Sequence, residues 1–126
     1  WPEYQILKRE QKNNLALVKV EKSKLSATGF ADFDDLKVGE RVFLVGNIFK
    51  SYPATSTLPI GFLFANEGII SSIDSDFIQT NIFEETRLAG SPIFDIQGNL
   101  VGLSQIDNSG RVKAIPVSKI KEFIGF

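Results

Sequence analysis

The sequence predicts an all-β domain, a barrel or a sandwich, that ends in one short helix. Two observations lead to this fold class. Runs rich in β-branched and aromatic residues recur at intervals of about 8–12 residues, separated by Gly, Asn, Asp and Pro. No long segment before the C-terminal end carries the apolar period of about 3.6 residues that a helix needs. The chain has 126 residues, which suits one domain, or one domain with part of a second.

The first half of the chain contains three predicted strands. Residues 3–10 and 15–21 are two strands that the polar turn QKNN joins. Residues 25–40 are polar and contain Gly and Asp, so we expect a connection there. The third strand covers residues 41–47, and a long loop with two prolines follows over residues 48–61.

The second half begins with residues 62–74, which we expect to form a long or bulged strand, and residues 76–82 form the next one. A hairpin is expected over residues 91–105. Its turn lies at either Gln97-Gly98 or Gly98-Asn99, because Gly and Asn adopt the left-handed backbone that tight hairpin turns need.

The chain then predicts one more strand, residues 111–117, followed by a helix over residues 118–126. Ser118 is a good N-cap, because its hydroxyl can accept a hydrogen bond from a free N–H of the first helical turn. Ile120 and Phe123 lie at helical spacing and give this short helix one apolar face.

Three residue types are absent: the chain has no Met, no Cys and no His. Because even position 1 is not Met, we expect a processed or excised piece, in which a lost signal peptide would leave no trace. Without cysteine there is no disulfide, thiolate nucleophile or zinc–thiolate site. Without histidine there is neither the usual general base near neutral pH nor the commonest metal ligand. Any chemistry would depend on carboxylates, lysines or hydroxyls, and we expect no cofactor and no metal site.

The net charge of −1 argues against a nucleic-acid partner. No apolar run reaches the roughly 18 residues that cross a bilayer, so we expect no direct insertion into a membrane. The charge is uneven, because residues 1–24 hold six Lys or Arg against three Glu. This segment is either a patch that meets phosphate or an acidic partner, or simply a solvated strand face.

The stretch TRLAGSPIFD, residues 86–95, has the shape of a loop that presents a nucleophilic serine, but Ala89 lies at its centre. From Asn13 onward, the order and spacing of several motifs resemble trypsin-like serine proteases, most closely the bacterial HtrA/DegP type. The segments that carry this resemblance are, in order, NNLALVKVE, DDLKVGERVFLVGNIF, NEGIISSI, DFIQTN, LAGSPIFDIQGNLVGL and VKAIPVSKIKEFI.

The resemblance implies a trypsin-like Greek-key β-barrel. Residues 37–126 would form the complete second barrel of six antiparallel strands plus the short C-terminal helix. Residues 1–36 would contribute two remnant strands of a partial first barrel and the connection between the barrels. Two strands cannot close a barrel, so Trp1, Tyr4, Ile6 and Leu7 should pack on missing upstream strands, another chain or the long loop.

The resemblance also implies that the catalytic positions are degenerate. Ala89 stands where the nucleophilic serine belongs, and Asn14 stands where the aspartate belongs. Arg87 replaces the glycine whose backbone N–H helps to stabilise the oxyanion. The histidine would lie upstream of this chain. We therefore expect no enzymatic activity, and we expect Arg87 and Leu88 to fill the former cleft.

The substrate of such a protease would lie as a strand along residues 108–113 according to the resemblance. Lys113 there replaces an apolar residue beside the former specificity pocket. We therefore expect partner binding to have moved to the long loop. The partner-binding residues expected on apolar character are Tyr52, Leu58, Ile60 and Phe62. The alternative is that the loop folds back and caps the barrel.

Three weaker candidates have ordinary structural readings. Ser91 could be a displaced nucleophile, but it lies two residues beyond Ala89 and should face the other way. The acidic cluster ADFDD, residues 31–35, could bind calcium or be a solvated connection, and it lacks the ligand spacing of an EF-hand. Glu84 and Glu85 should form a local ion pair with Arg87.

The sequence therefore favours a non-catalytic trypsin-like module that binds proteins or self-associates. The resemblance places it in the periplasm or another extracytoplasmic space, as part of an envelope assembly such as a flagellar-motor structure. The alternative is an active HtrA-like serine endopeptidase whose histidine lies in a missing segment.

Overall fold

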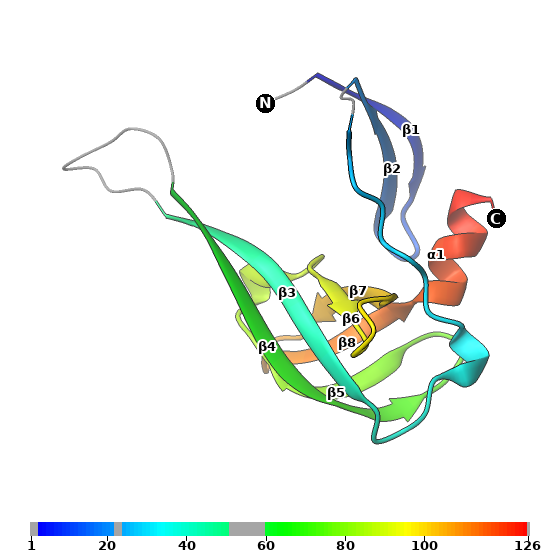
Figure 1. Cartoon of the computed structure of the whole chain (residues 1–126), viewed down its shortest axis with the longest axis vertical. Coiled ribbons are helices and arrows are strands. Elements are labelled where there is room, and N and C mark those ends of the chain that lie inside the picture. The colour runs from blue at the N-terminus through cyan, green and yellow to red at the C-terminus, as the bar shows by residue number, and fades with distance from the viewer. Residues whose placement is uncertain (1–2, 22–23, 51–59, 126) are drawn as a thin grey trace.

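The computed structural model describes residues 3–21, 24–50 and 60–125, without the side chains of residues 48–50 and 60. It confirms the all-β fold class: six antiparallel strands close a barrel in the order β3-β4-β5-β8-β7-β6, and β1 and β2 form a separate two-stranded sheet (Figure 1). The strands are β1 (Tyr4–Glu10), β2 (Leu15–Val20), β3 (Arg41–Lys50), β4 (Ile60–Ile73), β5 (Ile78–Phe83), β6 (Pro92–Phe94), β7 (Leu100–Ile106) and β8 (Arg111–Pro116). Two 3-10 turns, Phe33–Asp35 and Thr86–Leu88, and the helix α1 (Val117–Ile124) complete the described chain.

The barrel is filled by every second residue of its strands, because side chains alternate between the two faces of a strand. In β3, for example, Val42 and Leu44 are fully buried, while Phe43 and Val45 lie on the outer face and are half-buried. The core residues are Ala31, Val42, Leu44, Ile70, Ile78, Ile82, Ile93, Val101, Val112 and Ala114.

The barrel closes at a short seam between β3 and β6. β3 pairs with β4 along its whole length, whereas it pairs with β6 only through Phe43–Phe94 and Leu44–Ile93. The chain that precedes β6 does not follow β3 further. Instead it is hydrogen-bonded to β7, because the Gly90 N–H donates to the Ser104 carbonyl (2.8 Å).

The prediction of a loop over residues 48–61 is wrong at both of its boundaries. β3 continues to Lys50 and β4 begins at Ile60, so that the two strands form a long ribbon that projects from the barrel (Figure 1). The alternation of β3 extends past Gly46-Asn47, and Gly46 leaves room for the Phe64 ring on the neighbouring strand. Because a strand pair needs no turn there, the glycine marks a close contact and not the end of the strand.

The turn end of the β1–β2 hairpin contacts helix α1. The Lys8 ammonium donates to the Phe123 carbonyl at 2.7 Å and lies 5.3 Å from the centre of that ring. The opposite end of the hairpin is open: Tyr4, Ile6 and Leu7 are exposed by 66%, 39% and 53%. Within the described residues these three side chains, for which the sequence predicted a packing partner, therefore stay partly exposed, and Trp1 lies outside the described residues.

Helix α1 starts one residue earlier than predicted, and Ser118 is not its N-cap. The N-cap is Pro116, whose extended backbone ends β8, and no side chain caps the first turn. A proline there needs no partner for an N–H, which explains why the strand can pass directly into the helix. Val117, Ile120 and Phe123 form the buried face, and Gly125 ends the helix in the left-handed conformation with φ 101°.

The turn between β7 and β8 is organised by one carboxylate. Oδ1 of Asp107 accepts hydrogen bonds from the Ser109 hydroxyl (2.6 Å), the Ser109 N–H (2.9 Å) and the Arg111 N–H (3.0 Å). The Ser109 side chain, followed by the backbone N–H of Arg111, holds the pKa of Asp107 below its ordinary value of 3.8. The ionised carboxylate is therefore the form that the folded chain prefers.

We expect Asp107→Asn to lower the melting temperature at neutral pH. A group whose pKa is depressed on folding stabilises the fold above its unfolded-state pKa, and this contribution is lost as the pH falls through the folded-state value. The difference between the wild type and the variant should therefore shrink below the ordinary pKa of 3.8. Thermal unfolding followed across the acid range measures this difference. Equal melting temperatures at neutral pH would contradict the role of the charge.

Candidate functional site

The segment Thr86 to Pro92, which leads into β6, presents Ala89 at the surface of the barrel. The 3-10 turn η2 covers Thr86–Leu88, and Gly90 then reverses the chain with φ 93°. Four backbone N–H groups of this loop donate within the chain. Leu88 N–H donates to Glu85, Ala89 N–H to Thr86, Gly90 N–H to Ser104 and Ser91 N–H to Leu88, at 2.8–3.2 Å. The amide of Ala89 is therefore not directed at a ligand.

Asn14 and Ala89, the two degenerate positions, meet at one small pocket of about 160 Å³. Asn14 lies in the β1–β2 turn, directly before β2, with a left-handed backbone (φ 54°) that asparagine tolerates better than most residues. Its neighbour Asn13 is buried and donates to the Glu10 carboxylate at 2.6 Å. This bond orders the turn of the N-terminal hairpin, and the turn shares the pocket with Ala89 and Gly90 of the barrel.

This pocket contains no group that could move a proton near neutral pH. Its lining residues are Asn13, Asn14, Leu15, Ala89, Gly90, Leu103, Ser104, Gln105 and Ile115. The one hydroxyl among them is that of Ser104, which is 2% exposed and has no hydrogen-bond partner in the described part of the chain. Sequence reasoning missed Ser104, because a serine inside an apolar strand carries no signal of its place beside another element. The arrangement offers polar contacts and no acid–base pair.

Ser91 is fixed in a structural role. Its hydroxyl donates to the Leu88 carbonyl at 2.6 Å, and its backbone carbonyl accepts from the Ser104 N–H at 3.0 Å. A serine hydroxyl whose proton is held by a carbonyl inside its own loop lacks the adjacent base that activates a nucleophile.

Neither Arg87 nor Leu88 lines the small pocket where Asn14 and Ala89 meet, but both line a wider hollow of about 510 Å³ that Ala89 shares, and the filling of the former cleft stays a prediction. Leu88 turns inward and is 6% exposed, while Arg87 stays at the surface and pairs with Glu85. The expected local ion pair is therefore present, and it involves Glu85. Glu84 instead accepts a hydrogen bond from the Asn66 amide at 2.9 Å.

The segment from Asn108 to Lys113 cannot accept an added strand along its β8 part. Val112 and Lys113 pair with β7 on one side, and Lys113 pairs with Gln79 of β5 on the other. Both edges of the strand are thus used by the closed barrel, which the sequence pattern could not reveal. The Lys113 ammonium lies 3.9 Å from the centre of the Phe77 ring.

Of the predicted partner-binding residues, Phe62 is the one whose side chain the structure describes. It is 42% exposed on β4, opposite Ile48 of β3. The backbone of Ile60 begins β4. Tyr52 and Leu58 lie outside the described residues. The structure thus places part of this group on the projecting ribbon and leaves its partner-binding role a prediction.

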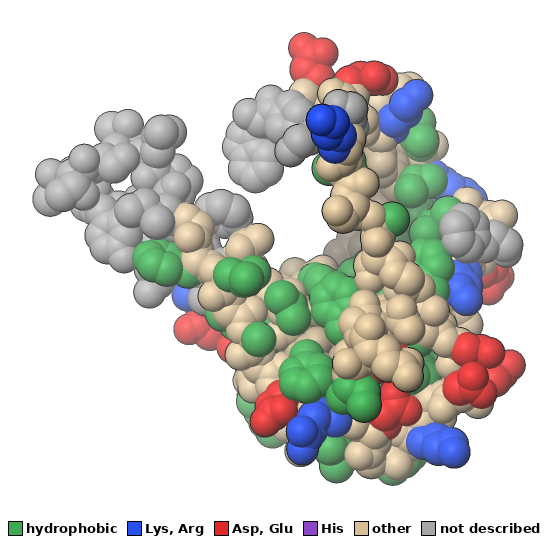
Figure 2. Space-filling view, viewed as in Figure 1, with side chains coloured by type: hydrophobic (Ala, Val, Ile, Leu, Met, Phe, Trp, Pro, Cys, Tyr) green, Lys and Arg blue, Asp and Glu red, His purple; other side chains and the backbone are tan. Residues whose placement is uncertain are grey.

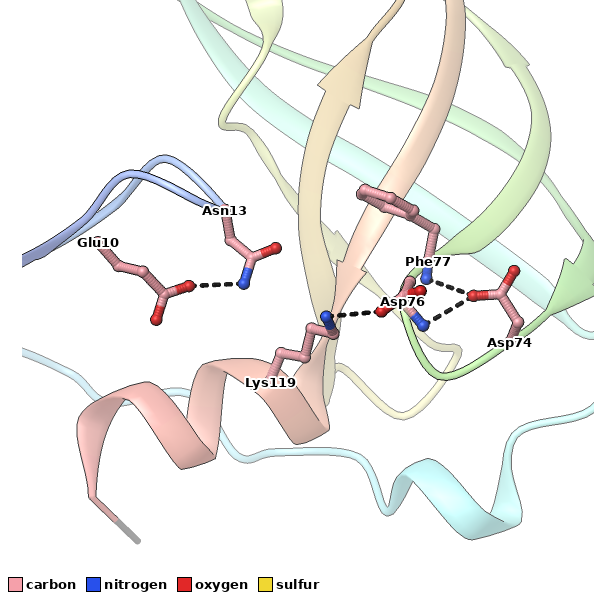
Figure 3. Close-up of polar contacts among 6 residues, drawn as sticks. All are labelled: Glu10, Asn13, Asp74, Asp76, Phe77 and Lys119. Carbon is pink, nitrogen blue, oxygen red and sulfur yellow. Dashed lines mark hydrogen bonds and ion pairs between the residues drawn. The ribbon is translucent and has the colours of Figure 1, made fainter.

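The charged N-terminal segment has mixed surroundings. Lys8, Arg9 and Lys12 line a pocket of about 390 Å³ next to Lys119 of α1, but two carboxylates share it. Figure 3 shows Lys119 reaching the turn between β4 and β5, where its ammonium lies 2.9 Å from Oδ1 of Asp76. The hydrogen bond and the charge of Lys119 hold the pKa of Asp76 below its ordinary value of 3.8.

The acidic connection forms the 3-10 turn η1, Phe33–Asp35, in which Asp32 caps the Asp34 N–H at 3.1 Å. Within the described ranges, no group of three or more acidic residues is arranged to hold a metal ion. The one helix of that part of the chain is also too short to cross a membrane.

Comparisons with known proteins agree with the six-stranded antiparallel barrel. Residues 3–103 match the family model described as a trypsin-like peptidase domain. Similar proteins include "Serine protease HTRA1" of Xenopus tropicalis, 27% identical over 95% of this chain and 27% of the relative. "Probable periplasmic serine endoprotease DegP-like" of Bartonella henselae is 31% identical over 91% of this chain and 24% of the relative. "Probable periplasmic serine protease do/HhoA-like" of Haemophilus influenzae is 26% identical over 92% and 26%. The chain therefore spans about a quarter of the length of these relatives.

Proposed function

Because the chain belongs to the trypsin-like peptidase family and resembles its HtrA-type members, we propose that it is a non-catalytic member that acts as a protein-binding or scaffolding module. One observation carries the proposal. The pocket where Asn14 and Ala89 meet contains no nucleophile with a base beside it and no titratable side chain. A binding role asks only for a stable surface, which the closed barrel provides.

The residues at the nucleophile and aspartate positions differ from those that the chemistry needs. The methyl group of Ala89 cannot attack a carbonyl carbon. The amide of Asn14 cannot stabilise an imidazolium as a carboxylate does. The N–H of Ala89 donates to the Thr86 carbonyl at 3.1 Å, so it is not free to stabilise an oxyanion. Loss of the nucleophile alone costs such enzymes about a millionfold in rate.

The proposed setting is extracytoplasmic, because relatives of this chain carry the word periplasmic in their names. We place the module in a bacterial periplasmic or envelope assembly, such as a flagellar-motor structure. In such an assembly a trypsin-like barrel would hold partner proteins together without cutting them.

The proposed partner surface is the β3–β4 ribbon with Tyr52, Leu58, Ile60 and Phe62. Its support is the apolar exposure of the ribbon, where Phe62 and Leu63, on opposite faces of β4, are exposed by 42% and 76%. Exposed apolar surface commonly marks a site of protein interaction.

A photo-crosslinking amino acid at position 62 of the whole protein, in its own cells, tests this surface. We expect one or a few discrete adducts, and we expect the same substitution at Ile96 to give none. Ile96 is a matched control, because it is apolar and 72% exposed, and it lies in the β6–β7 hairpin turn away from the ribbon. Adducts at position 96 but not at position 62 would contradict the assignment.

The second candidate is an active HtrA-like serine endopeptidase whose histidine lies elsewhere in the whole protein. It is favoured by the relatives, whose names describe them as proteases. Whole protein incubated with casein and with a fluorophosphonate probe separates the two functions. We expect neither cleavage nor labelling, and labelling of any serine in this domain would overturn the proposed non-catalytic role.

A further inference from the structure

The β1–β2 hairpin is joined to the barrel by an exposed connection. Among the described residues, β1 and β2 pair only with each other. Residues 24–29 are exposed and belong to no helix or strand. The backbone of the connection first bonds to the barrel at Gly29, whose carbonyl accepts from the Leu100 N–H at 2.8 Å. Residues 24–28 therefore pass from the hairpin to the barrel without a hydrogen bond to the backbone of another described residue.

Open space lies on both sides of this connection. Residues 26–29 line one side of a hollow of about 710 Å³, and the opposite wall includes Phe43, Val45 and Phe94. The Thr28 hydroxyl crosses at the end of this stretch and donates to the Gly98 carbonyl at 3.3 Å. In Figure 1 the connection is the blue-to-cyan coil that runs from β2 to the first 3-10 turn, and Figure 2 shows it at the molecular surface in the same view. Because a protease encloses the segment that it cuts, an exposed stretch of this kind favours cleavage.

Lys24 lies at the start of this stretch and has an unfavourable backbone conformation. Its φ is 65°, in the left-handed region that a residue with a Cβ rarely adopts. The next residue, Leu25, is 59% exposed. A protease binds the chain around the cut bond in an extended conformation. Extension of residues 24–28 breaks no hydrogen bond to another described backbone group, and it releases Lys24 from the left-handed region.

The other basic residues of the described chain have backbones that regular structure or turns hold in place. Most of them lie in strands or in helix α1. Arg87 lies in a 3-10 turn and Lys12 in the β1–β2 turn. The Lys37 carbonyl accepts from the Glu40 N–H at 3.1 Å. Within the part of the chain that the structure describes, Lys24 is therefore the basic residue whose backbone is least constrained.

We propose that the peptide bond between Lys24 and Leu25 is a processing site, at which an endoprotease that cleaves after lysine cuts the folded domain. Water is the second reactant. The C–N bond between the two residues breaks, Lys24 then ends in a carboxylate, and Leu25 begins with an ammonium group. Such an endoprotease holds the lysine ammonium with a carboxylate in its specificity pocket. The inference goes beyond the proposed protein-binding role and does not depend on it.

Cleavage at this bond leaves the hairpin on the barrel only through side-chain contacts at its turn end. The Lys8 ammonium donates to the Phe123 carbonyl at 2.7 Å, and Leu15 packs against an apolar cluster of barrel and helix residues. The hairpin also supplies Asn14 and its two neighbours to the pocket beside Ala89. Processing therefore offers a way to remove one wall of that pocket while the barrel stays closed.

Limited digestion of the folded whole protein with trypsin tests the site, with the new N-termini in this domain read by mass spectrometry at short times. We expect Leu25 to appear as an N-terminus at least about tenfold faster than any residue that follows another lysine or arginine of the domain, because the backbone at Lys24 needs no prior opening. In protein that is unfolded before digestion, the cleavage rates should become similar. This comparison separates the local structure from the sequence preference of trypsin.

Matched variants identify the lysine that is read. Lys24→Gln should remove the fast cut. Lys37→Gln should leave its rate unchanged, because Lys37 is also an exposed lysine between the hairpin and β3 but has a hydrogen-bonded carbonyl. Melting temperatures close to that of the wild type show that both variants are folded.

Three outcomes would overturn the inference. The first is an initial cut after any other lysine or arginine of the domain, including Lys22, which lies outside the described residues. The second is an unchanged fast cut in the Lys24→Gln protein. The third is the same preference for Lys24 in the folded and the unfolded protein. None of these results bears on the protein-binding role, which the crosslinks from position 62 test separately.

Discussion

Ala89→Ser in the whole protein is expected to remain unlabelled by a fluorophosphonate probe and inactive on casein. The new hydroxyl would lie in a pocket whose lining residues include no base, next to the amide of Asn14. The N–H at position 89 would still donate to the Thr86 carbonyl. Because a missing base alone costs about a millionfold in rate, we expect a signal about a millionfold below that of an active trypsin-like protease. Labelling intensity on a gel, calibrated with a dilution series of such a protease, measures this.

The double variant Ala89→Ser with Asn14→Asp provides the stricter form of this test. It restores the nucleophile and the carboxylate and leaves the 3-10 turn Thr86–Leu88 in place. We expect it to be inactive as well. Labelling at position 89 in either variant would show that a base from elsewhere in the whole protein reaches this pocket.

Gly102→Ala is expected to destabilise the barrel by about 3 kcal/mol, because forcing atoms into a packed core costs about 1–3 kcal/mol and more when the backbone must move. Gly102 lies in β7 with Ile93 of β6 and Pro116 of β8 opposite it. A Cβ at this position would stand 2.3 Å from the Ile115 carbonyl oxygen and 3.0 Å from the Ala114 methyl group. The carbonyl belongs to the neighbouring strand and cannot rotate away. Chemical denaturation measures the loss.

Gly29→Ala is the control for this change. A Cβ there would also be close to another atom, at 2.5 Å, but that atom is the side-chain oxygen of Asn99, which can rotate. We therefore expect a much smaller loss at Gly29 than at Gly102. Similar losses at both positions would mean that conformational freedom of glycine, and not the backbone contact across β7 and β8, determines the effect.

Much of the fold follows from local pattern. The alternation of apolar residues predicts the strands. The hairpin between β6 and β7 forms with its turn at residues 96–98. The Asp95 side chain stabilises this turn, because it accepts hydrogen bonds from the Gln97 and Asn99 N–H groups. The resemblance carried by the ordered motifs predicts the barrel that the structure confirms. The fold also brings Asn14 and Ala89, which are distant in sequence, to one pocket.

The features that the sequence did not predict depend on what a strand meets across the sheet. Whether the chain continues past Gly46 is decided by Phe64 on the neighbouring strand, which fills the space above the glycine. Leu88 is buried because its loop folds inward onto the barrel, although its position suggested a residue that fills the cleft. Both edges of β8 at Lys113 are paired because the barrel closes. None of these contacts leaves a trace in local composition.

The short β3–β6 seam also bears on the order in which the molecule assembles. β3 with β4, β4 with β5, and β6 with β7 are neighbours along the chain, whereas Leu44 and Ile93 are far apart in sequence. Bringing distant segments together costs more loop-closure entropy, and this seam offsets that cost with two residue pairs. We expect it to form last, after β5 has joined β8. Nascent chains then pass through a curled open sheet with two unpaired edges, which is the stage at which a chaperone would be needed to prevent aggregation.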